Sequence, residues 1–410
     1  MSKKRLLALV LALLMVLFCA CERNNPTVEP TAEPFRPKIA LITGTEEIEV
    51  DYDLNAVWEG IVNCGETNNI SVESFRPAAE TTEEYQRQIE QAVMTGCNVI
   101  ICQGDRFGAA LLAEAKKHPS ARFIGLDISV EGELPANVHT VWFRQEQAGY
   151  LAGYGAVMDG FRSLGALMAE NTPVYKSYAF GFIQGAGDAA KILETPIEIR
   201  SAYASMWGTR PEILDRLDLW YDDGVELVML ALNDATLTES CANVAVRKMG
   251  YLVGINNDQS YLAAYQEYNP FMTSAVKGLR EVIDATLDRM IATDDWQNVM
   301  AGKTTFYGLE NGNYLHLPDN EALWLFQGFT LEHYEEVKGK IADGSITVKN
   351  TDQDLVDENW VSWEKASVPI IEPTASPDAT ENPEQTAAPT VTPTVTPTAT
   401  PEATAAPEQN

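Results

Sequence analysis

Residues 138–153 read VHTVWFRQEQAGYLAG and indicate the fold of this chain more clearly than any other segment. The segment opens with an apolar run of β type at 138–143, and a turn and a helical stretch follow such runs along the chain. Seven further runs of this kind lie at 38–43, 98–103, 122–127, 164–168, 197–202, 226–232 and 251–256. Apolar strands that alternate with helices are typical of parallel sheets covered on both faces, so the sequence predicts an α/β protein.

The length and charge of the chain limit its possible functions. The chain has 410 residues, which is enough for two or three domains with sizeable cores. It carries 59 acidic and 29 basic side chains, so its formal charge is −30. Because such a charge repels phosphate backbones, we expect no nucleic-acid partner.

The amino-terminal residues are typical of an exported bacterial lipoprotein. Three basic residues, Lys3, Lys4 and Arg5, precede an apolar run at 6–20 that ends at Cys21. This pattern predicts a signal peptide at 1–20, a lipidated Cys21 and a flexible tether at 21–36. The alternative is an ordinary secretory signal in which Cys21 is incidental.

The other end of the chain has the composition of a disordered tail. From residue 369 onward there are nine prolines, six acidic residues and no basic residue, interleaved with Thr and Ala. Such a segment cannot bury enough apolar surface to fold, so 369–410 is predicted to be extended and disordered. Residues 349–368 form a short extension before it.

No pattern of catalytic, metal-binding or cofactor-binding residues is visible, so we expect no enzyme activity, no metal and no cofactor. The four histidines lack metal-ligand spacing, and no nucleophile elbow occurs. Gly185 and Gly187 match a dinucleotide fingerprint, but no strand precedes them, so close helix packing with Gly181 explains them better. The cysteines outside the signal are interpreted as buried thiols, and they are Cys64, Cys97, Cys102 and Cys241.

Residues 138–153 resemble the centre of the basic membrane protein family of ABC-transporter substrate-binding lipoproteins, whose best-known members bind purine nucleosides. Further matches follow in order along the chain, and together they cover about residues 37–348. They include KIALIT at 38–43, FIGLD at 123–127, Tyr203-x-x-x-Trp207 and GIN at 254–256.

The resemblance implies a type I periplasmic-binding-protein fold, in which two Rossmann-like lobes with parallel sheets are joined by crossover hinges. We expect lobe 1 at 37–140 plus 273–301 and lobe 2 at 141–272 plus 302–348. A return helix is expected at 273–293, and the crossovers are expected near 128–140, 257–272 and 294–303.

The resemblance also implies where a ligand binds, at the carboxyl ends of the strands. The polar positions that match are Asp51, Asn55, Asp127, Asn256, Asp258 and Lys277, and the aromatic candidates are Phe107, Trp142 and Trp207. The alternatives are structural. Asp51 and Asp127 can cap helices or end strands in solvent, Lys277 can form an exposed salt bridge on its helix, and the aromatic rings can be packing residues.

The chain departs from the family at four positions. Gly44, Asn256 and Thr209 stand where the family has Asp, and Leu54 replaces a Phe that stacks on the ligand. The resemblance therefore implies the family's fold and transport role with an altered ligand, which need not be a nucleoside.

These observations predict an extracytoplasmic, lipid-anchored, monomeric protein that captures a small polar, nucleoside-like solute for an ABC permease. The alternative, favoured by the long Pro/Thr-rich tail, is a membrane-anchored sensing or surface module with the same fold and no transport role.

Overall fold

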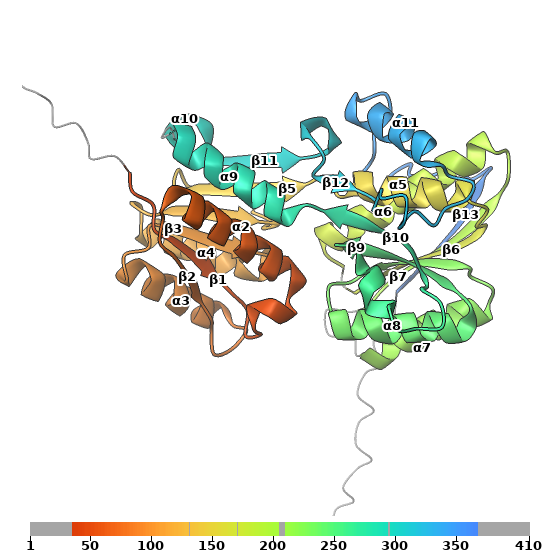
Figure 1. Ribbon diagram of the computed structural model, residues 1–410, viewed down its shortest axis with the longest axis horizontal. Coiled ribbons are helices and arrows are strands. Elements are labelled where there is room, and N and C mark those ends of the chain that lie inside the picture. The colour runs from red at the N-terminus through yellow and green to blue at the C-terminus, as the bar shows by residue number, and fades with distance from the viewer. Residues whose placement is uncertain (1–34, 131, 170, 205–209, 294–295, 368–410) are drawn as a thin grey trace, which may run out of the picture. The chain divides into compact units, whose positions relative to one another are not determined.

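The computed structural model describes residues 35–130, 132–169, 171–204, 210–293 and 296–367 (Figure 1). These residues all belong to one compact unit. The predicted signal peptide, Cys21, the tether up to residue 34, Trp207, Thr209 and the 369–410 tail lie outside the described residues.

Six strands of the described chain form a first sheet, in which every pairing is parallel. Apolar side chains fill both faces of β1 and β3, so these strands suit the centre of a covered sheet. In spatial order the strands are β11 (Lys303–Tyr307), β5 (Val138–Phe143), β4 (Arg122–Leu126), β3 (Val99–Gln103), β1 (Ile39–Ile42) and β2 (Val72–Phe75).

Helices cover both faces of the first sheet. Helices α2 (Tyr52–Asn68) and α9 (Leu279–Thr293) pack together on one face, and α3 (Thr82–Met94) and α4 (Gly108–Lys117) lie on the other. Thr81 caps α3 by accepting a hydrogen bond from the backbone of Glu84. The short helices of this region are η1 (Ile48–Val50), η2 (Asp105–Phe107) and α10 (Trp296–Val299).

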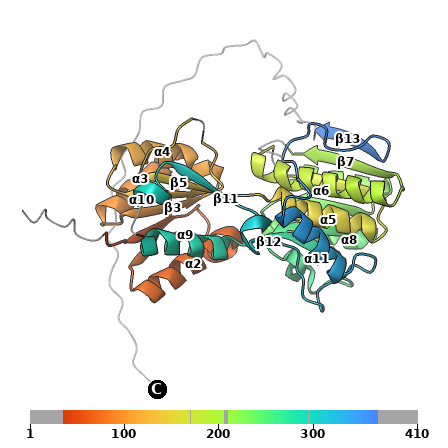
Figure 2. The same ribbon diagram turned by 90° about the horizontal axis from the view of Figure 1, so that it is seen from above.

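Seven described strands form a second sheet, parallel except where β10 meets β12. Helices α5 (Glu146–Met158) and α6 (Pro173–Ile192) cover one face, and α7 (Arg210–Asp222) and α8 (Ala235–Lys248) cover the other (Figures 1 and 2). The strand order is β12 (Leu315–His316), β10 (Phe271–Lys277), β9 (Tyr251–Asn256), β8 (Leu227–Ala231), β6 (Ser163–Met168), β7 (Ile197–Tyr203) and β13 (Val361–Ser367). Remaining helices are η3 (Gln259–Ala263), η4 (Leu309–Asn311) and α11 (Leu331–Ala342).

Glycines bring α5 and α6 into backbone contact. A Cβ atom on Gly181 would lie 1.9 Å from the carbonyl oxygen of Glu146, and one on Gly185 would lie 2.1 Å from that of Tyr150. On the facing helix, a Cβ on Gly153 would lie 2.0 Å from the carbonyl oxygen of Phe182. Helix packing is therefore confirmed as the role of Gly181 and Gly185.

The predicted fold class and all eight predicted strand runs are confirmed. The four cysteines that the structure describes outside the termini are buried thiols, as predicted.

Three predicted boundaries are wrong. The chain crosses between the sheets at 144–145, at 278 and at 308–314, because β5 and β11 belong to the first sheet and β10 to the second. The crossovers expected at 128–140, 257–272 and 294–303 are therefore displaced. The predicted 349–368 extension contains β13, which pairs with β7.

The start of the return helix is also wrong. Residues 271–277 form β10 because they pair with β9, and α9 begins only at Leu279. Leu279, Val282 and Ile283 are buried, as the predicted helix face requires.

Candidate functional site

Five buried polar side chains from both sheets meet in one network, which we call the polar cluster. Its members are Asp53, Asp127, Tyr178, Asn256 and Lys277. Asp53 lies in the first turn of α2, and Asp127 follows β4 of the first sheet. The other three belong to α6, β9 and β10 of the second sheet region. The polar cluster therefore joins elements of the two sheets.

Local backbone conformation helps to place two of these residues. Asp127 has a φ of 52° and Asn256 a φ of 67°, each where a strand ends. This left-handed conformation costs Asp and Asn less than most other residues. The left-handed backbone thereby directs the short side chains of Asp127 and Asn256 into the polar cluster.

The contacts in the polar cluster are short and directional. The Lys277 Nζ atom donates to Asp127 Oδ2 at 2.7 Å and lies 4.0 Å from Asp53 Oδ2. Asn256 Nδ2 donates to Asp53 Oδ2 at 2.9 Å, and its Oδ1 accepts from the Tyr178 hydroxyl at 3.1 Å. At the exposed edge of the cluster, Asn233 Nδ2 also donates to Asp53, at 3.2 Å.

Burial and charge pairing shift the pKa values of Asp53 and Lys277 in opposite directions. Burial raises the pKa of Asp53 to about 7, although the Lys277 charge acts to lower it. Burial acts to lower the pKa of Lys277, but attraction to Asp127 and Asp53 outweighs it and raises that pKa above its usual value. Lys277 is therefore a cation, while Asp53 gains a proton near neutral pH.

One acceptor atom of the polar cluster is available to accept a hydrogen bond from a ligand. Among the described residues, the Oδ1 atom of Asp127 is buried and has no hydrogen-bond partner. A buried carboxylate oxygen without a partner is costly, so a hydroxyl or N–H donor from a bound molecule would stabilise it.

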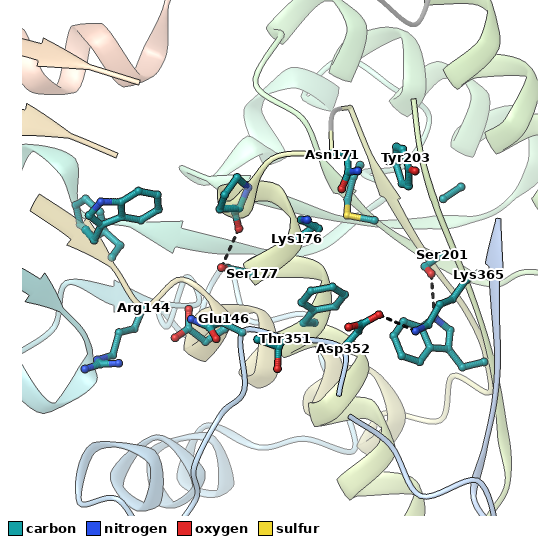
Figure 3. A pocket seen from close by; sticks show the side chains of 18 of the residues that line it. Arg144, Glu146, Asn171, Lys176, Ser177, Ser201, Tyr203, Thr351, Asp352 and Lys365 are labelled. Atoms are coloured by element: carbon teal, nitrogen blue, oxygen red, sulfur yellow. Dashed lines mark hydrogen bonds and ion pairs between the residues drawn. The ribbon is translucent and has the colours of Figure 1, made fainter. Parts of the chain in front are cut away.

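A cavity of about 720 Å³ lies next to the polar cluster, and Figure 3 shows side chains that line this cavity. Phe143 lines this cavity, and its ring centroid lies 5.4 Å from Lys277 Nζ. Ser177 of α6 also lines it and precedes Tyr178 of the polar cluster. The volume falls in the usual range of small-molecule sites, about 300–1,000 Å³.

The structure brings three predicted site residues, Asp127, Asn256 and Lys277, into the polar cluster. Trp142 lines the neighbouring cavity, with its indole N–H donating to the Ile128 carbonyl at 3.1 Å. The predicted helical position of Lys277 is wrong, since it ends strand β10, and its exposed-salt-bridge alternative is wrong because the residue is buried.

Four other predicted residues lie outside the polar cluster and have structural contacts. Asp51 caps α2 by accepting from the Leu54 backbone, and Asp258 caps η3. Asn55 donates to Glu59 at 3.3 Å. Phe107 is fully buried with its ring centroid 4.4 Å from that of Tyr85, which is a packing role.

Two members of the polar cluster, Asp53 and Tyr178, were missed from the sequence. Asp53 lies between the two predicted polar positions of the same helix start, so its type and place were visible but its burial was not. Tyr178 lies three residues before Gly181, on the glycine-marked part of α6 that contacts α5. The three-residue spacing from Gly181 is a signal in the sequence that could have identified Tyr178.

Within the described ranges, no group of three or more His, Cys, Asp and Glu side chains is arranged to hold a metal ion. No helix in the same ranges combines the length and the apolarity that crossing a membrane requires.

Two covered parallel sheets with the chain crossing between them have the architecture of type I periplasmic-binding proteins. A solved solute-binding protein of an ABC transporter system from Aeropyrum pernix K1 shares this fold. The TM-score is 0.60 at 15% identity, and the match covers 78% of this chain and 95% of that one.

The family is shown by sequence. The profile of the Bmp family, described as ABC transporter substrate-binding protein PnrA-like, matches residues 54–349, and the chain belongs to this family. The family resemblance predicted from the sequence is thereby confirmed.

Two relatives show how far the similarity extends. Basic membrane protein A2 of Borrelia garinii subsp. bavariensis is 24% identical over 237 residues, which are 57% of this chain and 66% of that protein. Basic membrane protein D of Borreliella burgdorferi is 27% identical over 248 residues, which are 59% of this chain and 69% of that protein. The match thus spans just under two thirds of the A2 protein.

Proposed function

We propose that this chain is an extracytoplasmic solute-binding lipoprotein that captures a small polar, nucleoside-like ligand for uptake by an ABC transporter. The two sheets with their helices act as two lobes, and the crossings at 144–145, 278 and 308–314 act as hinges. The main support is the polar cluster, where a buried lysine and two buried carboxylates link the two sheets in a member of a substrate-binding family.

The chemistry of the polar cluster suits a ligand with hydroxyl groups. Asp127 Oδ1 offers an unpaired acceptor, and Asn256 offers an amide that both donates and accepts. A sugar hydroxyl can donate to the carboxylate and accept from Lys277. Ligand contacts from both lobes would stabilise the closed form that a permease recognises.

Calorimetry tests this proposal. The purified protein is titrated with purine and pyrimidine nucleosides, free bases, sugars and amino acids, and a saturable 1:1 isotherm with a nucleoside is expected. The Asp127→Asn variant should weaken that binding at least tenfold, because it removes a charged acceptor. Asp343→Asn, at the exposed end of α11, is the matched control and should bind like the wild type. No heat across the whole panel would refute the proposal.

Uptake distinguishes transport from the alternative of a sensing or surface module. Deleting the gene should abolish import of the radiolabelled ligand identified by calorimetry, and a plasmid copy should restore it. Unchanged import in the deletion strain would favour the sensing module, which the Pro/Thr-rich tail supports by its composition.

A further inference from the structure

The cavity beside the polar cluster has a wall that the family profile does not cover. The profile match ends at residue 349, and Asn350, Thr351 and Asp352 line the cavity together with Trp363 and Lys365 of β13. Strand β13 is held in place by parallel pairing with β7 along its whole length. This chain's own carboxyl-terminal segment therefore helps to build the cavity.

The rings that line the cavity are held in fixed orientations. The indole N–H of Trp363 donates to Ser201 Oγ at 2.9 Å (Figure 3), and that of Trp142 donates to the Ile128 carbonyl at 3.1 Å. Phe180 and Phe306 add further apolar rings. Rings fixed in this way bind flat molecules by stacking at little cost in side-chain entropy.

The charge around the cavity is opposite to that of the chain as a whole. Three cations, Arg144, Lys176 and Lys365, line it against two acids, Glu146 and Asp352, although the chain carries −30. Two of the three cations have partners: Arg144 Nε lies 2.8 Å from Glu310, and Lys365 Nζ lies 2.9 Å from Asp352.

Lys176 is the third cation of the cavity wall. Within the part of the chain that the structure describes, its ammonium makes no ion pair or hydrogen bond, although its charge adds to that of Lys365 in lowering the pKa of Asp352. One ammonium without an ion pair fits a ligand with one negative charge.

We propose that this cavity is a second binding site, for a flat aromatic molecule that carries a single carboxylate. The ring stacks on Trp142 and the phenylalanine side chains, since Lys365 Nζ already lies over the Trp363 ring, 4.0 Å from its centroid. The carboxylate pairs with Lys176. This site lies beside the polar cluster and takes a ligand of a different chemical class from the proposed nucleoside.

Two probes of the same shape test the proposal. Indole-3-acetate and indole-3-acetamide share one ring system and differ in the charge of the side group. Calorimetry on the full-length protein should show the acetate binding at least tenfold more tightly than the amide, since one charged hydrogen bond is involved. Equal affinities, or no binding of the acetate, would overturn the proposal.

Two substitutions of Lys176 test whether this residue causes the preference for the acetate. Both Lys176→Met and Lys176→Gln should reduce the preference for the acetate to about one. Lys191→Met is the matched control, because Lys191 lies on the same helix, pairs with Asp357 and is absent from the cavity wall. It should keep the full preference. Thermal melting of each variant checks that it folds, and a folded Lys176 variant that keeps the preference would contradict the proposal.

The failure of this site and the failure of the proposed function give different results. Nucleoside binding without acetate binding would refute only the second site. Acetate binding that depends on Lys176, without nucleoside binding, would refute only the nucleoside proposal.

Discussion

Lys277 is the residue on which the polar cluster depends, because it is the charge that compensates two buried carboxylates. Its ammonium is buried together with Asp127 and Asp53, 2.7 and 4.0 Å away. Removing one partner of a buried ion pair leaves an uncompensated charge, which costs far more than losing an exposed pair.

Lys277→Met should lower the free energy of unfolding by about 3–5 kcal/mol, measured by urea denaturation. Lys340→Met provides the control, since Lys340 pairs with Glu336 at an exposed i,i+4 position of α11 and is worth at most about 0.5 kcal/mol. Similar losses in the two variants would show that the Lys277 pairs are no stronger than surface pairs.

Asp53 gives the protein a pH dependence with a defined sign. In the unfolded chain its pKa is about 3.9, and burial raises its pKa in the folded protein to about 7. Between these values the native state holds a proton that the unfolded chain has lost, so raising the pH lowers stability, by about 1.4 kcal/mol per pH unit for this group.

Asp53→Asn should therefore flatten the fall in Tm between pH 4 and pH 7. Part of the fall remains, because burial also raises the pKa of Glu146 to about 7. Melting curves across this pH range provide the measurement. A variant whose Tm falls as steeply as that of the wild type would show that Asp53 does not hold the extra proton.

Sequence comparison found Asp127, Asn256 and Lys277 because each lies next to a recognisable motif at a strand end. It could not find Asp53, since nothing in the sequence shows which of several polar residues at the start of α2 turns inward. Its burial depends on contact with Asn256 of β9, which lies 203 residues further along the chain. Such a distant contact leaves no local pattern.

At the scale of elements, the α5–α6 pair positions Tyr178 and the start of α6. The helices approach so closely that a Cβ on Gly153 would lie 2.0 Å from a backbone oxygen, which cannot rotate away as a side chain can. The polar cluster and the cavity wall both depend on this spacing.

Gly153→Ala should destabilise the protein by about 1–3 kcal/mol, because the two helices must move apart. Gly339→Ala is the matched control: Gly339 also lies in a helix, α11, but nothing lies within 4 Å of the added Cβ, so a gain of about 0.5–1 kcal/mol is expected. Chemical denaturation measures both. A stabilised Gly153→Ala variant would contradict the close-packing account.

Three of the strands that were not predicted from the sequence lack a clear strand pattern. Val72–Phe75 has two polar residues between its apolar ends, and Leu315–His316 has only two residues, so neither forms an apolar run. Residues 271–277 run directly into an amphipathic helix, and short apolar segments fit strand and helix periods equally well. Pairing with β9 then decides the conformation of these residues.

At the scale of the whole molecule, the predicted anchor has a direct test. Cys21→Ser should move the protein from the membrane fraction to the soluble exported fraction, because the lipid chains would have no attachment point. Metabolic labelling with radioactive palmitate should mark the wild type and not the variant. Unchanged fractionation and no label in the wild type would support the ordinary secretory signal.

The central claim is that a ligand binds between the two sheets at the polar cluster. A crystal structure of the complex with the tightest ligand of the calorimetric panel tests it most directly. We expect the ligand to contact Asp127 or Asp53 from the first sheet and Asn256, Tyr178 or Lys277 from the second. A ligand that contacts elements of one sheet alone, with the polar cluster unchanged, would contradict the claim.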